Sequence, residues 1–289
     1  MAPQAGGGAE RYGAHDRYGR RPAAWHNVDL VGSVVAAWCL AGGGTLGRLG
    51  GAMDHIEVGG LRVAFERRGE GPPLVLLHGW PSNSREWRRQ LDALSDEFTV
   101  VAWDAPGAGQ SSDPPETFGL ADWADCLAVF VEALNLRRPH VAGLSWGGGL
   151  ALELFRRHPT VPRTLILTSA YAGWAGSLPA EVVQHRLQLM LRNCELPSDQ
   201  WAPAWIKTLL AEDASEDMVA ELLLIASEIH PAGTRVAMRA FAEADLRDVL
   251  PRVDVATLLL YGDNDVRAPE EVWKPLLSGI RQSRTRATT

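Results

Sequence analysis

The sequence predicts an α/β protein built on a doubly wound, mostly parallel sheet with a helical cap insertion. Short, continuous apolar runs recur from Met53 onward, and segments with helical spacing separate them. Before the last of these runs lies a long stretch in which only helical spacing occurs. Buried strands that alternate with helices are typical of a parallel sheet covered on both faces. The long stretch predicts an inserted helical unit.

The first 52 residues differ from the rest of the chain. They are rich in Gly and Arg and lack apolar periodicity, so we expect residues 1–52 to form a disordered N-terminal extension. Residues 30–47 form an uncharged run of 18 residues with five glycines, downstream of Arg20 and Arg21. The alternative for this run is a signal or anchor segment of an exported protein. No Ala-x-Ala pattern follows it, which favours a cytoplasmic protein.

The patterned part of the chain begins with a predicted hairpin, because "HIEVGGLRVAFERRG" contains two alternating runs about a Gly-Gly pair. "PLVLLHG" and "FTVVAWD" then have the composition of short buried strands. Between them Trp87, Leu91 and Leu94 recur at helical spacing. This spacing predicts a helix, with Ser82 or Ser84 as its N-cap.

The remaining core elements follow the same alternation. A second apolar helix face ends at Asn135 and comprises Trp123, Leu127, Phe130, Val131 and Leu134. "PHVAGLS" predicts a strand and residues 146–157 a helix, "RTLILTSA" and "ATLLLYGD" predict two strands, and "APEEVWKPLLSGI" predicts a helix. We therefore assign residues 53–170 and 246–289 to the core and residues 171–245 to the cap.

The predicted cap contains three helical stripes and no strand pattern. The stripes are Val183, Leu187 and Met190; Trp201, Trp205 and Leu209; and Met218, Leu222, Ile225 and Ile229. For any single residue this periodicity indicates burial rather than ligand contact. As a unit, a helical insertion beside a site would act as a lid.

Charge and cysteine content limit the partners. The formal net charge of −7 does not favour binding to polyanions. We therefore expect a small-molecule substrate, and neither nucleic acid nor a membrane surface as a partner. The cysteines are Cys39, Cys126 and Cys194, which lack paired or metal-ligand spacing. We predict reduced, mostly buried thiols, and neither a metal nor a cofactor.

The stretch "HVAGLSWGGGL" places Ser145 between two glycines, at the end of a predicted strand and directly before a predicted helix. A nucleophile at such a turn adopts a strained backbone, and the flanking glycines leave room for the close approach that this requires. The N-terminal amides of the helix then point to the place where negative charge would develop. The pattern predicts a nucleophilic serine.

With these features the chain resembles the α/β-hydrolase superfamily over residues 53–279. "HGWP" resembles the family's oxyanion loop, "DAPGAGQSS" its Asp-x-x-Gly-x-Gly-x-Ser loop, and "YGDNDVRAP" the strand end that carries the catalytic acid. The resemblance implies that the amides of Trp80 and Trp146 form the oxyanion hole.

The resemblance also implies Asp265 as the catalytic acid, in preference to Asp263. For Asp263 and Asp104 we favour hydrogen bonding to the local backbone in turns. In such proteins the chain order is Ser, acid, His, yet none of the eight histidines of this chain follows Asp265. His185 and His230 in the insertion are the remaining candidates for a base.

The serine indicates acyl transfer through an acyl-enzyme. Epoxide hydrolases and dehalogenases with similar loops use an aspartate at this turn, so the resemblance favours an esterase or lactonase acting on a small to medium apolar acyl compound. An aminopeptidase, a C–C bond hydrolase and a perhydrolase are alternatives within the same resemblance.

The C-terminal segment departs from the family pattern. "RQSRTRATT" stands where relatives have an apolar strand, a loop with the catalytic histidine and a last helix. We therefore expect the last strand, the histidine loop and the last helix to be absent and the activity to be impaired. A non-catalytic binding or interaction protein is the alternative of a different class. The strand "ATLLLYGD" would then present an exposed edge for self-association.

Overall fold

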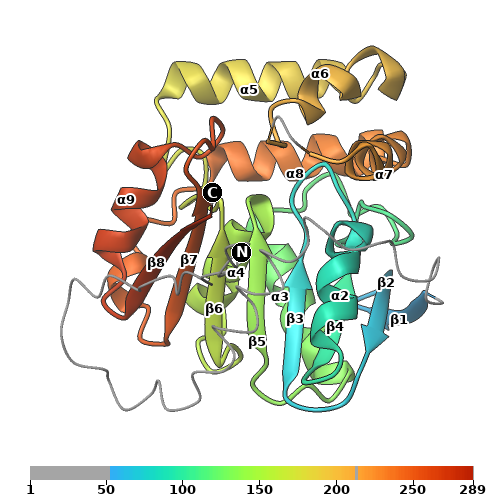
Figure 1. The fold of residues 1–289 in the computed structure, drawn as a ribbon. Coiled ribbons are helices and arrows are strands. Elements are labelled where there is room, and N and C mark those ends of the chain that lie inside the picture. Colours follow the sequence, from blue (N-terminus) through green and yellow to red (C-terminus); the bar gives the residue numbers. More distant parts are fainter. Residues whose placement is uncertain (1–52, 212–213, 289) are drawn as a thin grey trace, which may run out of the picture.

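The computed structural model describes residues 53–211 and 214–288. The predicted extension, with residues 30–47 and Cys39, lies outside the described residues. The described chain forms an eight-stranded sheet in the order β1-β2-β4-β3-β5-β6-β7-β8. A group of helices, α5 to α8, lies beyond one end of the strands (Figure 1).

The sheet is mostly parallel, as predicted. β1 (Asp54–Val58) and β2 (Leu61–Arg68) form the predicted hairpin, and β2 also pairs antiparallel with β4 (Thr99–Trp103). All other neighbouring pairs are parallel, and they add β3 (Pro73–Leu77), β5 (His140–Leu144), β6 (Thr164–Thr168), β7 (Thr257–Gly262) and β8 (Ser283–Thr288).

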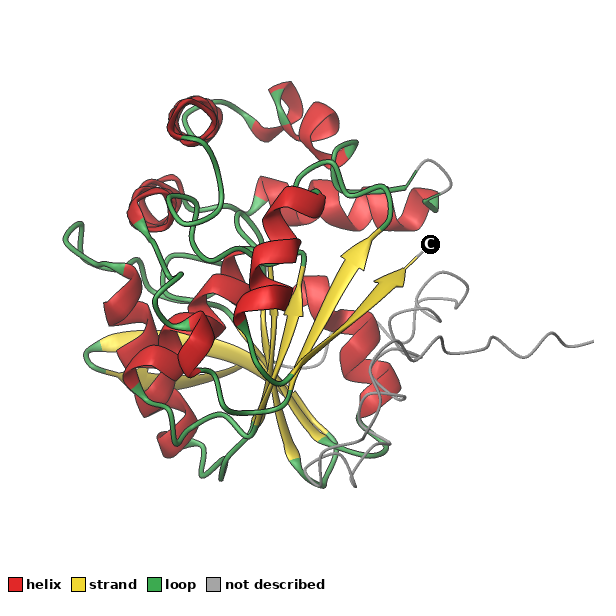
Figure 2. Ribbon diagram, turned by 90° about the vertical axis from the view of Figure 1, so that its left-hand side faces the viewer, coloured by secondary structure: helices red, strands yellow, loops and turns green. Residues whose placement is uncertain are grey.

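Helices cover both faces of the sheet (Figure 2). They are η2 (Ser84–Trp87), α2 (Arg88–Leu94), α3 (Leu120–Ala133), α4 (Trp146–Arg157) and α9 (Glu270–Gly279), with the short η4 (Leu250–Arg252) before β7. Leu74 and Leu76 of β3 pack in one buried cluster with Leu91 of α2, whereas Val75 and Leu77 pack in the other cluster with α3 and α4. This alternation along a buried strand confirms the doubly wound architecture.

The prediction that Ser82 or Ser84 is the N-cap of the first core helix is wrong. Neither Ser82 nor Ser84 caps η2; the Asn83 side chain does, and it accepts a hydrogen bond from the Arg85 amide at 3.1 Å. Asn ranks with Ser as an N-cap because its side-chain oxygen reaches the same orphan amides. The predicted stripe of Trp87, Leu91 and Leu94 is confirmed, since all three are buried.

The insertion between β6 and β7 is helical within its described residues. It contains α5 (Ala180–Asn193), η3 (Ser198–Gln200), α6 (Ala202–Ile206), α7 (Glu216–Ser227) and α8 (Pro231–Glu243). Trp201, Ile206 and Ala226 form a small core of their own. The first predicted stripe lies within α5. The second and third overlap α6 and α7, but Trp201, Leu209 and Ile229 lie outside these helices. α8 was not predicted.

The predicted absence of the last strand is wrong. Ser283–Thr288 forms β8, which pairs in parallel with β7 from Thr257↔Ser283 to Gly262↔Thr288. A strand needs only backbone pairing, so the polar sequence at this position does not prevent it. Consequently β7 is paired on both sides, and β8 is the edge strand of the sheet formed by the described residues. The described residues end at Thr288, so the predicted absence of a histidine loop and a last helix stays a prediction.

Within residues 53–211 and 214–288, no helix is both long and apolar enough to cross a membrane. The same residues contain no cluster of His, Cys, Asp or Glu able to hold a metal ion. Cys126 and Cys194 are buried free thiols, as predicted, and burial raises the pKa of Cys126 to about 12.

Candidate active site

Ser145 occupies a strained turn between β5 and α4. Its backbone has φ 51° and ψ −109°, a region that residues with a side chain rarely adopt. The Ser145 carbonyl accepts hydrogen bonds from the Gly148 and Gly149 amides at 3.0 and 3.2 Å, and its own amide donates to Thr168 O at 2.8 Å. The side chain is half-buried. The turn therefore holds a serine at the carboxyl end of the central strand, at the N-terminus of a helix.

Two glycines make this turn sterically feasible. A Cβ atom on Gly143 would lie 2.2 Å from the Gly147 carbonyl oxygen, and one on Gly147 would lie 2.3 Å from the Leu77 carbonyl oxygen. Both distances are far below van der Waals contact, so neither position accepts a side chain without backbone movement. These glycines stand on either side of the serine, as the sequence pattern predicted.

The Trp80 and Trp146 rings pack against each other beside the turn. Their centroids are 4.9 Å apart in an edge-to-face arrangement, and Trp123 contacts both rings. Trp146 is the first residue of α4, so its amide has no acceptor within the helix. The Trp80 amide forms no hydrogen bond within the described part of the chain. Within the described residues, neither amide predicted for the oxyanion hole is used in a hydrogen bond.

His78 fixes the loop that carries Trp80. The imidazole is fully buried, with Nδ1 2.6 Å from Gly79 O and Nε2 3.0 Å from the Ala105 amide nitrogen. Because the Ala105 amide can only donate, Nε2 accepts and Nδ1 carries the proton. Burial lowers the pKa of His78, which keeps the ring neutral. With both nitrogens engaged, His78 is a structural residue.

The half-buried Glu86 lies on the other side of the same loop. Its Oε2 accepts a hydrogen bond from the Gly79 amide at 2.8 Å. Removal from water raises the pKa of Glu86 to about 7, and the hydrogen bond from Gly79 opposes this rise. The sequence analysis did not single out Glu86, because its burial arises only when η2 packs against the β3 loop.

The half-buried Asp265 lies in the turn after β7. Its Oδ1 accepts hydrogen bonds from the Arg267 and Ala268 amides at 2.8 and 2.9 Å. Within the described residues Oδ2 forms no hydrogen bond, so it remains available as an acceptor. Asp263 is exposed. Of these two acids, Asp265 is therefore the one for which the structure shows a fixed carboxylate.

Asp104 is a structural acid. It is buried, its Oδ1 accepts from the Ser84 amide at 2.7 Å, and its Oδ2 accepts from the Gln110 amide at 2.8 Å. The predicted turn chemistry is confirmed, and the Ser84 contact extends it to the segment after the Trp80 loop.

Of the remaining described histidines, none shares a contact with both Ser145 and Asp265. His140 begins β5 and bonds to Thr164, at the opposite end of the strand from Ser145. His158 follows α4 and bonds to Asp125, and His185 is exposed on α5. His140 and His158 therefore belong to structural contacts away from the serine.

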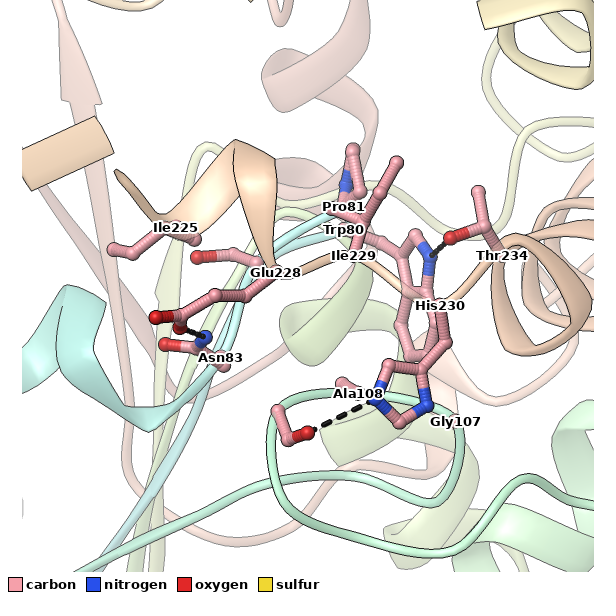
Figure 3. Close-up of a pocket in the computed structure, with 12 residues that line it drawn as sticks. Trp80, Pro81, Asn83, Gly107, Ala108, Ile225, Glu228, Ile229, His230 and Thr234 are labelled. Atoms are coloured by element: carbon pink, nitrogen blue, oxygen red, sulfur yellow. Dashed lines mark hydrogen bonds between the residues drawn. The ribbon is translucent and has the colours of Figure 1, made fainter. Parts of the chain in front are cut away.

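His230 lies beside Trp80 but is already engaged. It lines a small cavity of about 10 Å³ together with Trp80 and Thr234 (Figure 3). Nδ1 lies 2.8 Å from Asp113 Oδ1, and Nε2 lies 2.9 Å from Gly109 O. Ser145 and Asp265 do not line this cavity. His230 therefore joins the insertion to the loop after β4 and is not oriented toward the serine.

Comparison with known proteins identifies the family. Residues 72–218 match the α/β hydrolase fold family, and the chain belongs to it. A pimeloyl-[acyl-carrier protein] methyl ester esterase of Aeromonas hydrophila is 30% identical over 73% of this chain and 84% of its own length. The AB hydrolase superfamily protein YisY of Bacillus subtilis is 28% identical over 77% of this chain and 85% of its own length.

The fold comparison agrees with the sequence comparison. A thermophilic esterase from Thermogutta terrifontis superimposes with a TM-score of 0.75 at 27% identity, covering 82% of this chain and 90% of its own. Hydrolase chemistry is thereby supported for this chain at the level of the superfamily.

Proposed function

We propose that this protein is a serine hydrolase of carboxylic esters or lactones. The observation that carries the proposal is the strained backbone of Ser145 at the N-terminus of α4. Strain of this kind persists where the surrounding structure enforces it, and it presents the hydroxyl above the sheet. The relatives named as esterases support the same substrate class.

In the proposed reaction Ser145 Oγ attacks the carbonyl carbon of the ester, and the hydroxyl proton passes to a base. The carbonyl oxygen becomes an oxyanion, which the amides of Trp80 and Trp146 stabilise. Collapse releases the alcohol, which takes the proton from the base, and leaves an acyl group on Oγ. Water then hydrolyses the acyl-enzyme by the same route. No cofactor is required in this scheme.

Asp265 serves in this proposal to orient an imidazole and to stabilise its charged form. No histidine follows Asp265 within the 289 residues, and none of the described histidines is positioned between the two. We therefore propose that this chain by itself hydrolyses esters weakly. In this proposal the insertion acts as the lid over the site. The substrate is a small molecule, and the protein binds neither a membrane nor nucleic acid.

Hydrolysis of p-nitrophenyl butyrate tests the proposal. The 289-residue chain should turn over slowly, and Ser145→Ala should change the rate little. A fusion that adds a histidine loop and a helix from an esterase relative after β8 should raise kcat/KM by roughly 10²–10⁴-fold. The matched control is the same fusion with that histidine replaced by alanine. Brisk, Ser145-dependent turnover without the fusion would show that the chain already holds a base.

The second candidate is a non-catalytic binding protein of the same fold. The observation that favours it is the engagement of His78 and His230 in structural contacts, since no described histidine then remains as a proton acceptor for the serine. If the fusion fails to raise turnover while the protein remains folded, this second candidate gains support.

A further inference from the structure

Two arginines from distant parts of the chain meet beside the turn that carries Asp265. Arg186 lies on α5, and Arg267 follows Asp265 by two residues. Arg186 Nη2 donates to the Arg267 carbonyl oxygen at 3.1 Å, and Arg186 Nη1 donates to the Tyr171 hydroxyl at 3.1 Å. The Tyr171 hydroxyl in turn donates to the Arg267 carbonyl oxygen. This network fixes the Arg186 guanidinium beside the backbone of Arg267, near the carboxyl ends of β6 and β7.

The two guanidinium groups lack a counter-ion. Within residues 53–211 and 214–288, no carboxylate lies within ion-pair distance of either group. Among the described residues, the Arg267 guanidinium has one hydrogen-bond partner, Thr208 Oγ1, at 3.4 Å. Both arginines are half-buried. Removal from water, together with repulsion from Arg186, lowers the pKa of the Arg267 guanidinium. Two neighbouring cations taken partly out of water destabilise the fold unless an anion joins them.

The nearby acid compensates only part of this charge. Asp265 acts on Arg267 electrostatically, but its Oδ1 is held by two backbone amides rather than by a guanidinium. Two positive groups and one negative group leave a net charge of about one unit, which matches a monoanion such as a carboxylate better than a doubly charged phosphate.

The arginine pair lies at the same end of the sheet as the nucleophile. The Ser145 amide bonds to the last residue of β6, and a Cβ atom on Gly149 would lie 3.5 Å from the Tyr171 carbonyl oxygen. Tyr171 therefore runs beside the first turns of the helix that Ser145 begins.

We propose that Arg186 and Arg267 form a subsite for a carboxylate of the substrate, so that the ester is a monoester of a dicarboxylic acid. This inference rests on the proposed function and adds the substrate class to it. The ester carbonyl reaches Ser145, and the free carboxylate at the other end of the acyl chain receives N–H groups from the two guanidinium groups. Arginine suits this role because its planar donors match both carboxylate oxygens.

Calorimetric titration of a Ser145→Ala protein tests the subsite without turnover. Monomethyl glutarate should bind roughly tenfold or more tightly than dimethyl glutarate, which has the same chain without the charge. Arg267→Gln should abolish this preference, because it removes the charge but keeps the backbone carbonyl that Tyr171 and Arg186 contact. Arg186→Lys should weaken it while it retains the charge.

The matched control is Arg247→Gln. Arg247 is exposed and pairs with Asp245. Within the described part of the chain it forms no hydrogen bond or ion pair with Arg186, Arg267 or Tyr171, so its loss should leave the preference unchanged. Equal binding of the two glutarate esters would overturn the proposal, because the chain's own carboxylates would then neutralise the pair. Tighter binding of inorganic phosphate than of monomethyl glutarate would overturn the carboxylate assignment. Neither result depends on whether Ser145 is a nucleophile, which hydrolysis of p-nitrophenyl butyrate decides separately.

Discussion

The Glu86 carboxylate accepts a hydrogen bond from the Gly79 amide at 2.8 Å, directly before the residue that supplies a candidate oxyanion amide. The contact ties η2 to the loop after β3. Asp104 holds the same segment from the other side through the Ser84 amide. Two acids therefore set the conformation of the loop that carries Trp80.

Glu86 should make stability depend on pH. Its pKa is about 7 in the folded chain because of removal from water, against an ordinary value of 4.5. The folded state thus binds the proton of the Glu86 carboxyl group more tightly than the unfolded state does. The stability that this protonation contributes is fully present below pH 4.5 and is lost as the pH rises through 7. Glu86→Gln should leave Tm nearly unchanged at pH 5 and raise it at pH 8. Scanning calorimetry at both pH values measures this, with the exposed Glu57→Gln as control. An equal Tm difference at both pH values would contradict the prediction.

Gly147→Ala should destabilise the turn at Ser145. The new Cβ would lie 2.3 Å from the Leu77 carbonyl oxygen and 2.6 Å from that of His78, so β3 or α4 must move. We expect a loss of about 2 kcal/mol or more in the free energy of unfolding. Gly119→Ala is the control, because its Cβ would meet only Asp122 Oδ2, at 3.6 Å. Urea denaturation of both variants compares them; a loss no larger than that of Gly119→Ala would mean that the turn adapts.

An ion-pair network joins the insertion to the core near the Trp80 loop. Arg85 contacts Glu221 at 3.1 Å and Glu228 at 2.8 Å, and Arg88 contacts Glu221 at 3.1 Å. The two arginines belong to η2 and α2, and Glu221 belongs to α7. These contacts are partly shielded from water, so they should hold α7 in place more firmly than exposed pairs do.

Arg85→Ala should therefore loosen α7. We expect amide hydrogen exchange within α7 to accelerate about tenfold, whereas α4 should stay protected. Arg252→Ala is the matched control, since it removes a single, more exposed ion pair to Asp248. Exchange measured by mass spectrometry on both variants separates the effects. Unchanged exchange in α7 would show that apolar packing alone holds the helix.

Large, regularly spaced side chains made most of the fold predictable. The stripe at Trp87, Leu91 and Leu94 predicted the first core helix, and the alternation about Gly59 and Gly60 predicted the hairpin. These signals work because burial of one face requires the matching period. The strained turn at Ser145 was predictable for a similar reason, because glycines must stand where backbones meet.

α8 escaped prediction because most of its buried residues are small. Gly233, Thr234, Ala237 and Ala242 are buried in this helix but give no conspicuous apolar stripe. Pro231 at its first position was the available signal, since proline favours the start of a helix. β8 was not predicted for a different reason. Its pairing with β7 depends on backbone groups, which every sequence carries, and not on its polar side chains.

The candidate site was predictable only in part. Ser145 and Asp265 follow from local motifs, whereas Glu86 and the pair of Arg186 and Arg267 become notable only through burial and charge in three dimensions. Arg186 and Arg267 are 81 residues apart, and neither lies in a pattern of its own. Such contacts depend on tertiary packing, which periodicity does not report.

The exposed edge of the sheet at β8 leads to a last prediction, on self-association. Unpaired backbone groups of an edge strand pair readily with a second copy, and charged side chains oppose this. Arg284 and Thr285 are exposed on β8. We expect Arg284→Val to promote dimers through this edge, because the substitution removes the charge and raises strand propensity. Arg284→Lys keeps the charge and serves as the control. Light scattering over a range of protein concentrations measures the effect; if the valine and lysine variants have the same mass at every concentration, β8 is not an association edge.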